Sequence, residues 1–414
     1  MHWTRTILPV LAAILLVACQ GIEKPYEGTY DQVLIYYGMG YNNLSSNLKT
    51  NLDQLRTDIL PGLSSDKAIV AFSHNVASSG DYSTPNAPVL MRIFRGSDGQ
   101  PVTDTLKVYD DMTLSASSSS IRRVLDDIRT AFPAEHYGMI VSSHGTGWIP
   151  AGYDYDTERA SRASVASRAA LAQERARWPE TKAFGNQYRG GSGSVTWVEL
   201  PEWAQAIPMH LDYLILDTCL SGCVEVAYEL KDVCDRLVVS PTEILTSGMV
   251  YTTLSWDMLA GSSPDLLTYC REYYDFYNGS SGALRSGTIT LVECSQLDAL
   301  ASAFAAIVGA HQDALSEPSL INSVQRYHYS SSPFRFYFDL RDLCAQIGAT
   351  DAELSRLDAA LAAAVPYHAE TPAFFDLLLE HCCGLSVYLP EAGRPLLNQF
   401  YRDLAWNRAT GLIE

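Results

Sequence analysis

The chain has 414 residues, of which 47% are hydrophobic and 18% are charged, and its formal net charge is −18 at pH 7. This much apolar material can form a large buried core, which argues against a disordered chain. The acidic balance argues against a nucleic-acid-binding protein, because binding to phosphate relies on Lys and Arg.

The first 19 residues have the features of a targeting segment. Arg5 supplies a positive charge, Ile7–Val17 is an apolar stretch shorter than a bilayer span, and Cys19 follows Leu-Val-Ala. The pattern is similar to a bacterial lipobox, in which Cys19 becomes lipidated after cleavage; an ordinary secretory signal with a chance cysteine is the alternative. Because several acyl chains on one residue anchor a protein stably, we expect an exported lipoprotein on the periplasmic or outer face of the cell envelope, tethered by residues 20–29.

Apolar runs alternate with amphipathic stretches along the rest of the chain. We predict strands at residues 33–37, 68–73, 89–94, 105–109, 138–143, 213–216, 236–240, 287–292 and 385–389. We predict helices at residues 44–59, 118–132, 196–206, 224–234, 264–277, 296–314, 340–346, 351–364 and 396–406. Several strands are continuous hydrophobic runs interleaved with helices, which indicates an α/β fold with a mostly parallel sheet covered on both faces.

We divide the mature chain into a catalytic core at residues 30–255 and a C-terminal, largely helical α/β elaboration at residues 256–414, packed on the core. Residues 151–194 interrupt the pattern with a polar stretch that carries seven of the 29 basic residues. This insertion is either a solvated segment with some helix at residues 165–178 or a cleavable linker, since exposed flexible loops are preferred sites of proteolysis.

Eight cysteines follow Cys19, and an even number in an exported protein favours disulfides. Most of them, however, lie in apolar segments of regular structure, where a free cysteine behaves as a small core residue. We therefore expect mainly buried thiols. The sequence has no paired CxxC motif for zinc and no EF-hand spacing for calcium, so no metal site is predicted.

Two predicted strands end in residues that carry chemistry. Residues 138–143 lead into His144-Gly145, and residues 213–216 lead into Asp217-Thr218-Cys219. Sites in open parallel sheets form at the carboxyl ends of strands, so adjacent strands would bring His144 and Cys219 together. A thiol needs a nearby base to become a nucleophile. Taken singly, His144 would be a structural histidine and Cys219 a buried or bridged cysteine; the two motifs together favour a catalytic pair.

These motifs resemble the clostripain family (peptidase C11) of the caspase-like clan of cysteine peptidases. The similarity includes LIYYGMGYNNL at residues 34–44, HGTGW at 144–148, DTCLSGCVEVAYEL at 217–230 and GLSVYLP at 384–390. The resemblance implies a caspase-like three-layer α/β/α sandwich and no obligatory cofactor, although some relatives use calcium.

The resemblance also implies roles for individual residues. Cys219 would be the nucleophile and His144 the acid and base, with the backbone N–H groups of Gly145 and Cys219 forming the oxyanion hole. Asp217 would help to bind a basic P1 side chain, meaning the residue before the cleaved bond; the alternative is that it caps the strand end.

The loop after residue 240 departs from the family pattern. Ser247 stands where a second carboxylate is often found in the family. Glu243 is a further candidate for substrate binding; the alternative is that it only forms part of the wall of the site. A pocket with one carboxylate would hold Arg or Lys less tightly, because doubly paired guanidinium is the stronger arrangement. Cleavage after Arg or Lys is therefore a hypothesis, as is self-activation by a cut in the Arg-rich insertion.

We thus expect a membrane-anchored cysteine endopeptidase that acts on peptides or proteins. The alternatives are a non-catalytic surface lipoprotein that binds a ligand on the same fold, and another thiol chemistry such as an amidase or acyl transferase. No local feature of the sequence indicates an oligomeric state.

Overall fold

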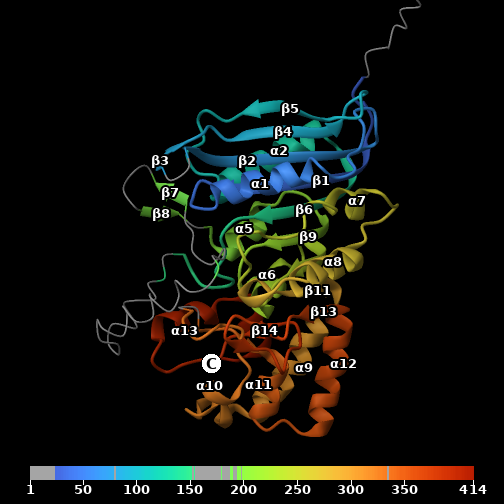
Figure 1. Ribbon diagram of the computed structural model, residues 1–414. Coiled ribbons are helices and arrows are strands. Elements are labelled where there is room, and N and C mark those ends of the chain that lie inside the picture. The colour runs from blue at the N-terminus through green and yellow to red at the C-terminus, as the bar shows by residue number, and fades with distance from the viewer. Residues whose placement is uncertain are drawn as a thin grey trace, which may run out of the picture.

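The protein is described by a computed structural model that covers residues 24–78, 81–151, 153, 179, 187–189, 194–196, 198–332 and 335–414 (Figure 1). The expected lipidation site Cys19, and most of the Arg-rich insertion with its predicted helix, lie outside these residues.

Within the described residues, ten strands form one sheet in the order β13-β11-β10-β9-β6-β1-β2-β4-β5, with β3 also paired to β2. The five central strands are parallel: β10 (Cys234–Val239), β9 (Leu211–Asp217), β6 (Ala134–Ser142), β1 (Tyr30–Gly40) and β2 (Lys67–Ser78). The flanking strands run antiparallel: β3 (Asp81–Pro85), β4 (Val89–Arg95), β5 (Pro101–Val108), β11 (Thr288–Glu293) and β13 (Tyr367–Glu370). The predicted α/β sandwich with a mostly parallel centre is confirmed.

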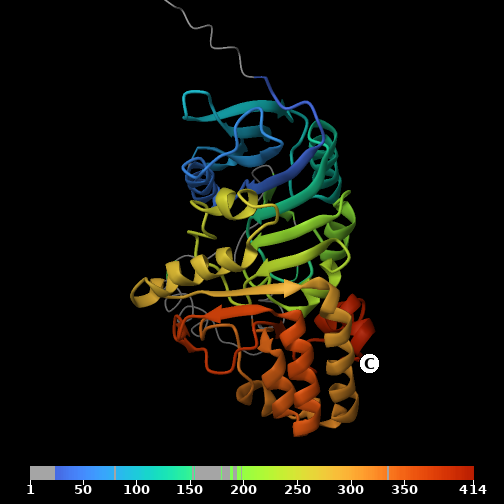
Figure 2. The ribbon, with the colours of Figure 1, turned by 90° about the vertical axis from the view of Figure 1, so that its right-hand side faces the viewer.

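Helices cover both faces of the sheet, as Figure 2 shows with α1, α7 and α8 on one side and α2 on the other. Those in the first two thirds of the described chain are α1 (Ser45–Leu55), α2 (Ser118–Ala131), α5 (Leu200–Ala206), α6 (Val224–Leu230), α7 (Leu254–Leu259) and α8 (Leu266–Asn278). The later ones are α9 (Leu297–Ala310), α10 (Leu320–Ser323), α11 (Leu340–Gln346), α12 (Asp351–Ala364), α13 (Pro395–Arg402) and α14 (Ala405–Thr410).

Short elements complete the described chain. Two-stranded pairs form between β7 (Gln187–Arg189) and β8 (Ser194–Thr196), β12 (Phe338–Asp339) and β16 (Ser386–Val387), and β14 (Ala373–Phe374) and β15 (Leu377–Leu378). Single 3₁₀ turns are η1 (Gly282–Leu284), η2 (Cys294–Gln296) and η3 (Gln312–Ser316). Because β11 and β13 extend the same sheet as β10, the C-terminal part of the chain shares one sheet with the N-terminal part.

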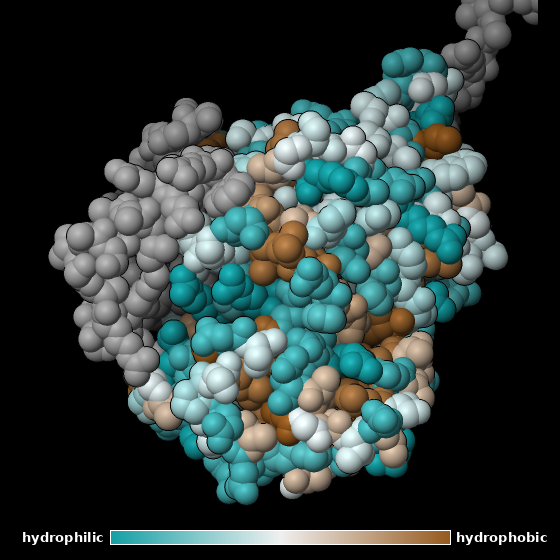
Figure 3. Space-filling model, turned by 60° about the horizontal axis from the view of Figure 1, so that its bottom comes forward, coloured by the Kyte–Doolittle hydropathy of each residue, from teal (hydrophilic) through white to brown (hydrophobic). Residues whose placement is uncertain are grey.

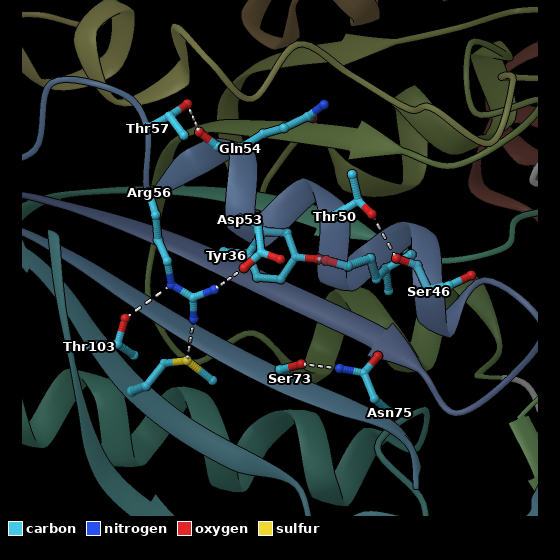
Figure 4. A network of polar contacts seen from close by, with 12 residues as sticks. Tyr36, Ser46, Thr50, Asp53, Gln54, Arg56, Thr57, Ser73, Asn75 and Thr103 are labelled. Atoms are coloured by element: carbon cyan, nitrogen blue, oxygen red, sulfur yellow. Dashed lines mark hydrogen bonds and ion pairs between the residues drawn. The ribbon is translucent and has the colours of Figure 1, made fainter. Parts of the chain in front are cut away.

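Local sequence explains several of these elements. In α2, the side chain of Ser117 accepts a hydrogen bond from the Ser120 N–H and so caps the helix, and α12 begins with a full capping box formed by Thr350 and Glu353. At the C-terminal end of α1, Arg56 ties the helix to the sheet: its Nε lies 3.0 Å from Thr103 of β5, while its Nη1 lies 2.6 Å from Asp53 (Figure 4).

Several predicted elements differ in the structure; the helix predicted at residues 224–234, for example, ends at Leu230, and Cys234 already begins β10. The helix predicted at residues 396–406 is two helices, α13 and α14, separated by Asp403 and Leu404. The helix predicted at residues 196–206 begins only at Leu200, with Pro201 in its first turn, where the fixed φ of proline is favourable. The run at residues 385–389 forms only the short β16, because the Tyr388 N–H donates to the Glu225 side chain at 2.9 Å instead of joining a ladder.

The eight cysteines of the described chain are free thiols, six of them buried, as expected. No helix of the described residues combines the length and apolar character needed to cross a bilayer. On the face drawn in Figure 3, apolar residues occur in small groups among polar ones.

Candidate active site

His144 lies just beyond the end of β6, on the loop that leads away from the sheet. Its side chain is mostly buried, and its Nε2 lies 2.8 Å from the Asn43 Oδ1. Asn43 belongs to the turn between β1 and α1, which Asn42 fixes through bonds to the Met39 carbonyl at 3.0 Å and the Leu44 N–H at 2.9 Å. Sequence reasoning noted this Asn-Asn-Leu turn only as part of the resemblance and did not foresee its contact with the histidine.

Cys219 lies just beyond the end of β9, the neighbour of β6 in the sheet. Its side chain is 0% exposed, and the Ile244 N–H donates to its Sγ at 3.0 Å. The next residue, Leu220, has a φ of 58°, an uncommon conformation for a residue with a side chain. The Leu220 N–H is held by the Thr242 carbonyl at 3.0 Å, so the loop after β10 supports the turn that carries the thiol.

Gly145 is the point of contact between the histidine and cysteine loops. A Cβ at this position would lie 2.7 Å from the Thr218 Cβ and 3.0 Å from the Cys219 carbonyl oxygen. Contacts this short exclude any side chain, so glycine is what permits the close approach. The parallel register of β6 and β9, which pairs Ser142 with Asp217, brings the two loops to the same edge of the sheet.

Behind this contact, aromatic residues connect both loops to the C-terminal part of the chain. The Trp148 ring lies 4.8 Å from the Tyr388 ring and 4.9 Å from the Tyr401 ring. The Tyr401 hydroxyl donates to the Glu225 Oε1 of α6 at 2.6 Å. Burial raises the pKa of Glu225 to about 7 and raises the pKa of the adjacent Cys223 thiol well above its usual value.

Asp217 is the last residue of β9 and is fully buried. Its side chain lies on the face of the sheet opposite to that of its neighbour Leu216. Its carboxylate accepts hydrogen bonds from the Ser142 hydroxyl at 2.7 Å, the Tyr251 hydroxyl at 2.6 Å and the Met249 N–H at 3.1 Å. These bonds fasten the loop after β10 to the strand ends. A residue that only caps the strand end would make the same hydrogen bonds. The P1-binding role of Asp217 therefore stays a prediction.

The other predicted substrate-binding residues lie in the same loop. The Ser247 hydroxyl is 2.9 Å from the Tyr277 hydroxyl of α8, and Tyr277 also donates to the Gly248 carbonyl at 2.7 Å. Glu243 is buried, and its Oε1 accepts from the Ser332 hydroxyl at 3.0 Å. Ser247 comes two residues before Met249, whose N–H bonds to Asp217, whereas Glu243 is turned toward residues of the C-terminal part.

One group of possible metal ligands occurs among the described residues, at the opposite edge of the sheet. Asp31, Glu135 and His136 each offer a ligand atom, and these atoms lie within 4.8 Å of one another. His136 also pairs with Asp212 at 2.8 Å, and Asp31 with Lys67 at 3.9 Å. These residues lie at the beginning of β1 and β6, whereas His144 follows the end of β6, so this group lies away from the candidate active site.

A model of the clostripain family (peptidase C11) matches residues 178–371, a range that contains Cys219 and the loop after β10. This part of the chain is similar to the clostripain family. The match is to a family of cysteine peptidases and agrees with the resemblance seen in the sequence.

Solved structures share the fold of this chain. Two are described as an inactive zymogen C11 protease from Parabacteroides distasonis and a secreted C11 cysteine protease from Bacteroides thetaiotaomicron; each is 24% identical, with a TM-score of 0.73, covering 92% of this chain and 99% of that chain. A third, also a secreted C11 cysteine protease from B. thetaiotaomicron, is described in complex with an irreversible peptide inhibitor; it is 20% identical, with a TM-score of 0.71 and the same coverage. The comparison with curated proteins gave no match.

Proposed function

We propose that this protein is a cysteine endopeptidase that works through Cys219 and His144. The observation that carries the proposal is the packing of Gly145 against Thr218 and the Cys219 carbonyl, which joins the histidine and cysteine loops at the ends of neighbouring parallel strands. The match of residues 178–371 to the clostripain family supports the same chemistry.

In this mechanism the Cys219 thiolate attacks the carbonyl carbon of the cleaved bond. The N–H groups of Gly145 and Cys219 donate to the oxyanion that forms, and His144 gives a proton to the leaving amine. Water, deprotonated by His144, then hydrolyses the thioester and releases the second product. The Asn43 side chain at 2.8 Å would hold the imidazole in position for both proton transfers.

The test is cleavage of a peptide panel that varies at P1, comparing the wild type with Cys219→Ala. Cys344→Ala, at a buried thiol of α11, is the matched control and should retain turnover. Turnover by the wild type and the control but not by Cys219→Ala is the expected result. Equal turnover in all three proteins would reject the catalytic assignment, and none in the wild type would favour the binding-module alternative.

Cleavage after Arg or Lys is the proposed specificity. The Asp217 carboxylate and the nearby Ser247 supply one charge and one hydroxyl, so we expect a preference for basic P1 residues that is weaker than a pocket with two carboxylates would give. The same panel tests this point. Turnover confined to non-basic P1 residues would retain the mechanism and reject Asp217 as the anchor.

We further propose that the enzyme activates itself by cutting within the Arg-rich insertion. Cys219 has no exposed surface in the uncut chain, so a peptide reaches its Sγ only after a rearrangement. The P. distasonis relative is described as an inactive zymogen, which is in keeping with such a step. Purified wild-type protein should run as two bands in a denaturing gel and Cys219→Ala as one. Intact single bands in both would reject self-activation.

Lipidation at Cys19 is the proposed mode of anchoring. We expect the wild type, expressed in a bacterial host, to partition into the detergent phase of a Triton X-114 extraction. Cys19→Ser should move to the aqueous phase. Detergent partitioning that is the same for both proteins would contradict an anchor at this residue.

A further inference from the structure

A mainly apolar cavity of about 130 Å³ opens beside His144. It is lined by residues from the ends of β1, β6 and β9 and from α5 and α6, chiefly Met39, Val141, Leu216, Leu200, Trp203 and Val226. The loop from His144 to Gly147 and the side chain of Thr218 form its polar rim. A water needs about 10–15 Å³ by this measure, so the cavity has room for an aliphatic or aromatic side chain.

The cavity and Asp217 lie on opposite sides of the sheet. Side chains alternate between the two faces along a strand, so Val141 and Leu216 face away from their neighbours Ser142 and Asp217. Ser142 and Asp217 are hydrogen-bonded to each other and lie toward the loop that contains Ser247. The nucleophile loop therefore runs between two regions: the proposed P1 site on one side and the cavity on the other.

We propose that this cavity is the subsite for the P1′ side chain, the first residue of the leaving group, and that it selects apolar residues. The inference rests on the proposed function, because His144 must protonate the leaving amine and so the leaving residue must lie beside it. His144 lines the cavity, whereas Asp217, Ser247 and Met249 do not. A residue that leaves past His144 would thus place its side chain over this cavity.

The lining also determines which side chains the subsite rejects. Among the described residues that line it, His144 is the one with an ionisable side chain. A P1′ Lys would lose its hydration without gaining a carboxylate partner, which is costly. A P1′ Asp would find only His144, whose proton the leaving amine needs. An apolar P1′ residue would instead gain from leaving water.

The experiment uses internally quenched peptides that are identical except at P1′, which is Gly, Ala, Leu, Phe, Asp or Lys, each with the best P1 residue of the panel above. We expect kcat/KM for P1′ Leu or Phe to exceed that for Gly by about 10-fold or more, with Asp and Lys the poorest. A coumarin amide, which has no P1′ side chain, reports the peptidase activity alone. If the coumarin substrate is cleaved while kcat/KM is flat across P1′ or highest for Asp or Lys, the subsite is rejected and the peptidase stands. If neither kind of substrate is cleaved, both proposals fall.

Two variants test the cavity itself. Ala116→Leu would fill it from the segment before α2, and should bring the Leu-to-Gly ratio of kcat/KM close to one; Trp203→Ala would enlarge it, and should shift the preference from Leu toward Phe. Ala131→Leu, at the exposed end of α2, is the matched control and should leave the ratio unchanged. The ratio does not depend on the fraction of folded enzyme. If Ala116→Leu and Trp203→Ala alter all substrates equally, the cavity is structural and the proposal is wrong.

Discussion

At the scale of single residues, the candidate active site depends on how closely the histidine and cysteine loops can pack. Gly145 leaves room for Thr218 and the Cys219 carbonyl at distances that a methyl group would violate. On the other side of the imidazole, Asn43 supplies an oxygen 2.8 Å from Nε2. These two contacts fix the position of the loop and the orientation of the ring.

We predict that Gly145→Ala lowers kcat/KM on the order of 100-fold, since displacement of reacting groups by about 1 Å can cost that much. Peptide hydrolysis measures the loss, and circular dichroism reports whether the fold is retained. Gly309→Ala in α9 is the control, because a Cβ there meets no atom within 4 Å. Activity of Gly145→Ala equal to that of the control would mean that the loops do not need this contact.

Asn43→Ala should lower kcat roughly 10-fold, because a catalytic base that loses its orienting partner is held less well for proton transfer. Steady-state kinetics on the best P1 peptide would separate kcat from KM, and we expect KM to change little. Asn322→Ala, at an exposed position of α10, is the matched control. An unchanged kcat would show that other contacts hold the imidazole.

At the scale of elements, α6 connects the nucleophile loop to the C-terminal segments. Its Glu225 is fully buried and accepts bonds from the Tyr388 N–H and the Tyr401 hydroxyl. Burial without a neighbouring cation among the described residues accounts for its pKa, which is raised from 4.5 to about 7. The folded chain therefore holds this proton more tightly than the unfolded chain does.

Stability should depend on pH through this residue. A pKa raised on folding contributes stability that is full below pH 4.5 and is lost as the pH rises to about 7. Glu225→Gln removes that dependence. The free energy of unfolding of the variant, relative to that of the wild type, should therefore be higher at pH 8 than at pH 4 by roughly 3 kcal/mol, at about 1.4 kcal/mol per pKa unit. Urea unfolding at both pH values measures the difference, with exposed Glu317→Gln as the control. A pH-independent difference would contradict the raised pKa.

At the scale of the whole molecule, the chain on either side of the insertion contributes to one sheet. β6 precedes residues 151–194 and β9 follows them, yet the two strands pair in register. The Lys67 Nζ also bonds to the Leu259 carbonyl at 2.8 Å, and the Ser255 N–H to Asp58 at 2.6 Å, both across the same division. We therefore expect a cut in the insertion to leave the sheet and its helices intact.

We predict that the two fragments produced by limited trypsin digestion of Cys219→Ala within the insertion stay together under native conditions. They should elute in one peak in size-exclusion chromatography and run as two bands in a denaturing gel. In concentrated urea they should separate, since the ladder and the core that join them are lost. Separate elution in native buffer would show that the sheet cannot hold the fragments.

Much of this organisation was readable in the sequence because it depends on local patterns. The buried central strands appeared as continuous apolar runs, and the ends of β6 and β9 carried His144-Gly145 and Cys219 as adjacent motifs. Shorter elements were not predicted because their sequence patterns are weak. The helix α7 (Leu254–Leu259) has only about one and a half turns. The edge strand β13 (Tyr367–Glu370) is polar, and pairing with the sheet stabilises it rather than its own residues.

The sequence by itself determined the fold class, the resemblance to the clostripain family and the two motifs with Cys219 and His144, since each rests on residues adjacent along the chain. Only the tertiary structure decided which strands are neighbours, that Asn43 meets His144, that Glu225 meets Tyr401, and that a cavity lies opposite Asp217. These contacts join segments 101 and 176 residues apart for the first two pairs. Packing of the whole core, rather than any local pattern, brings such segments together.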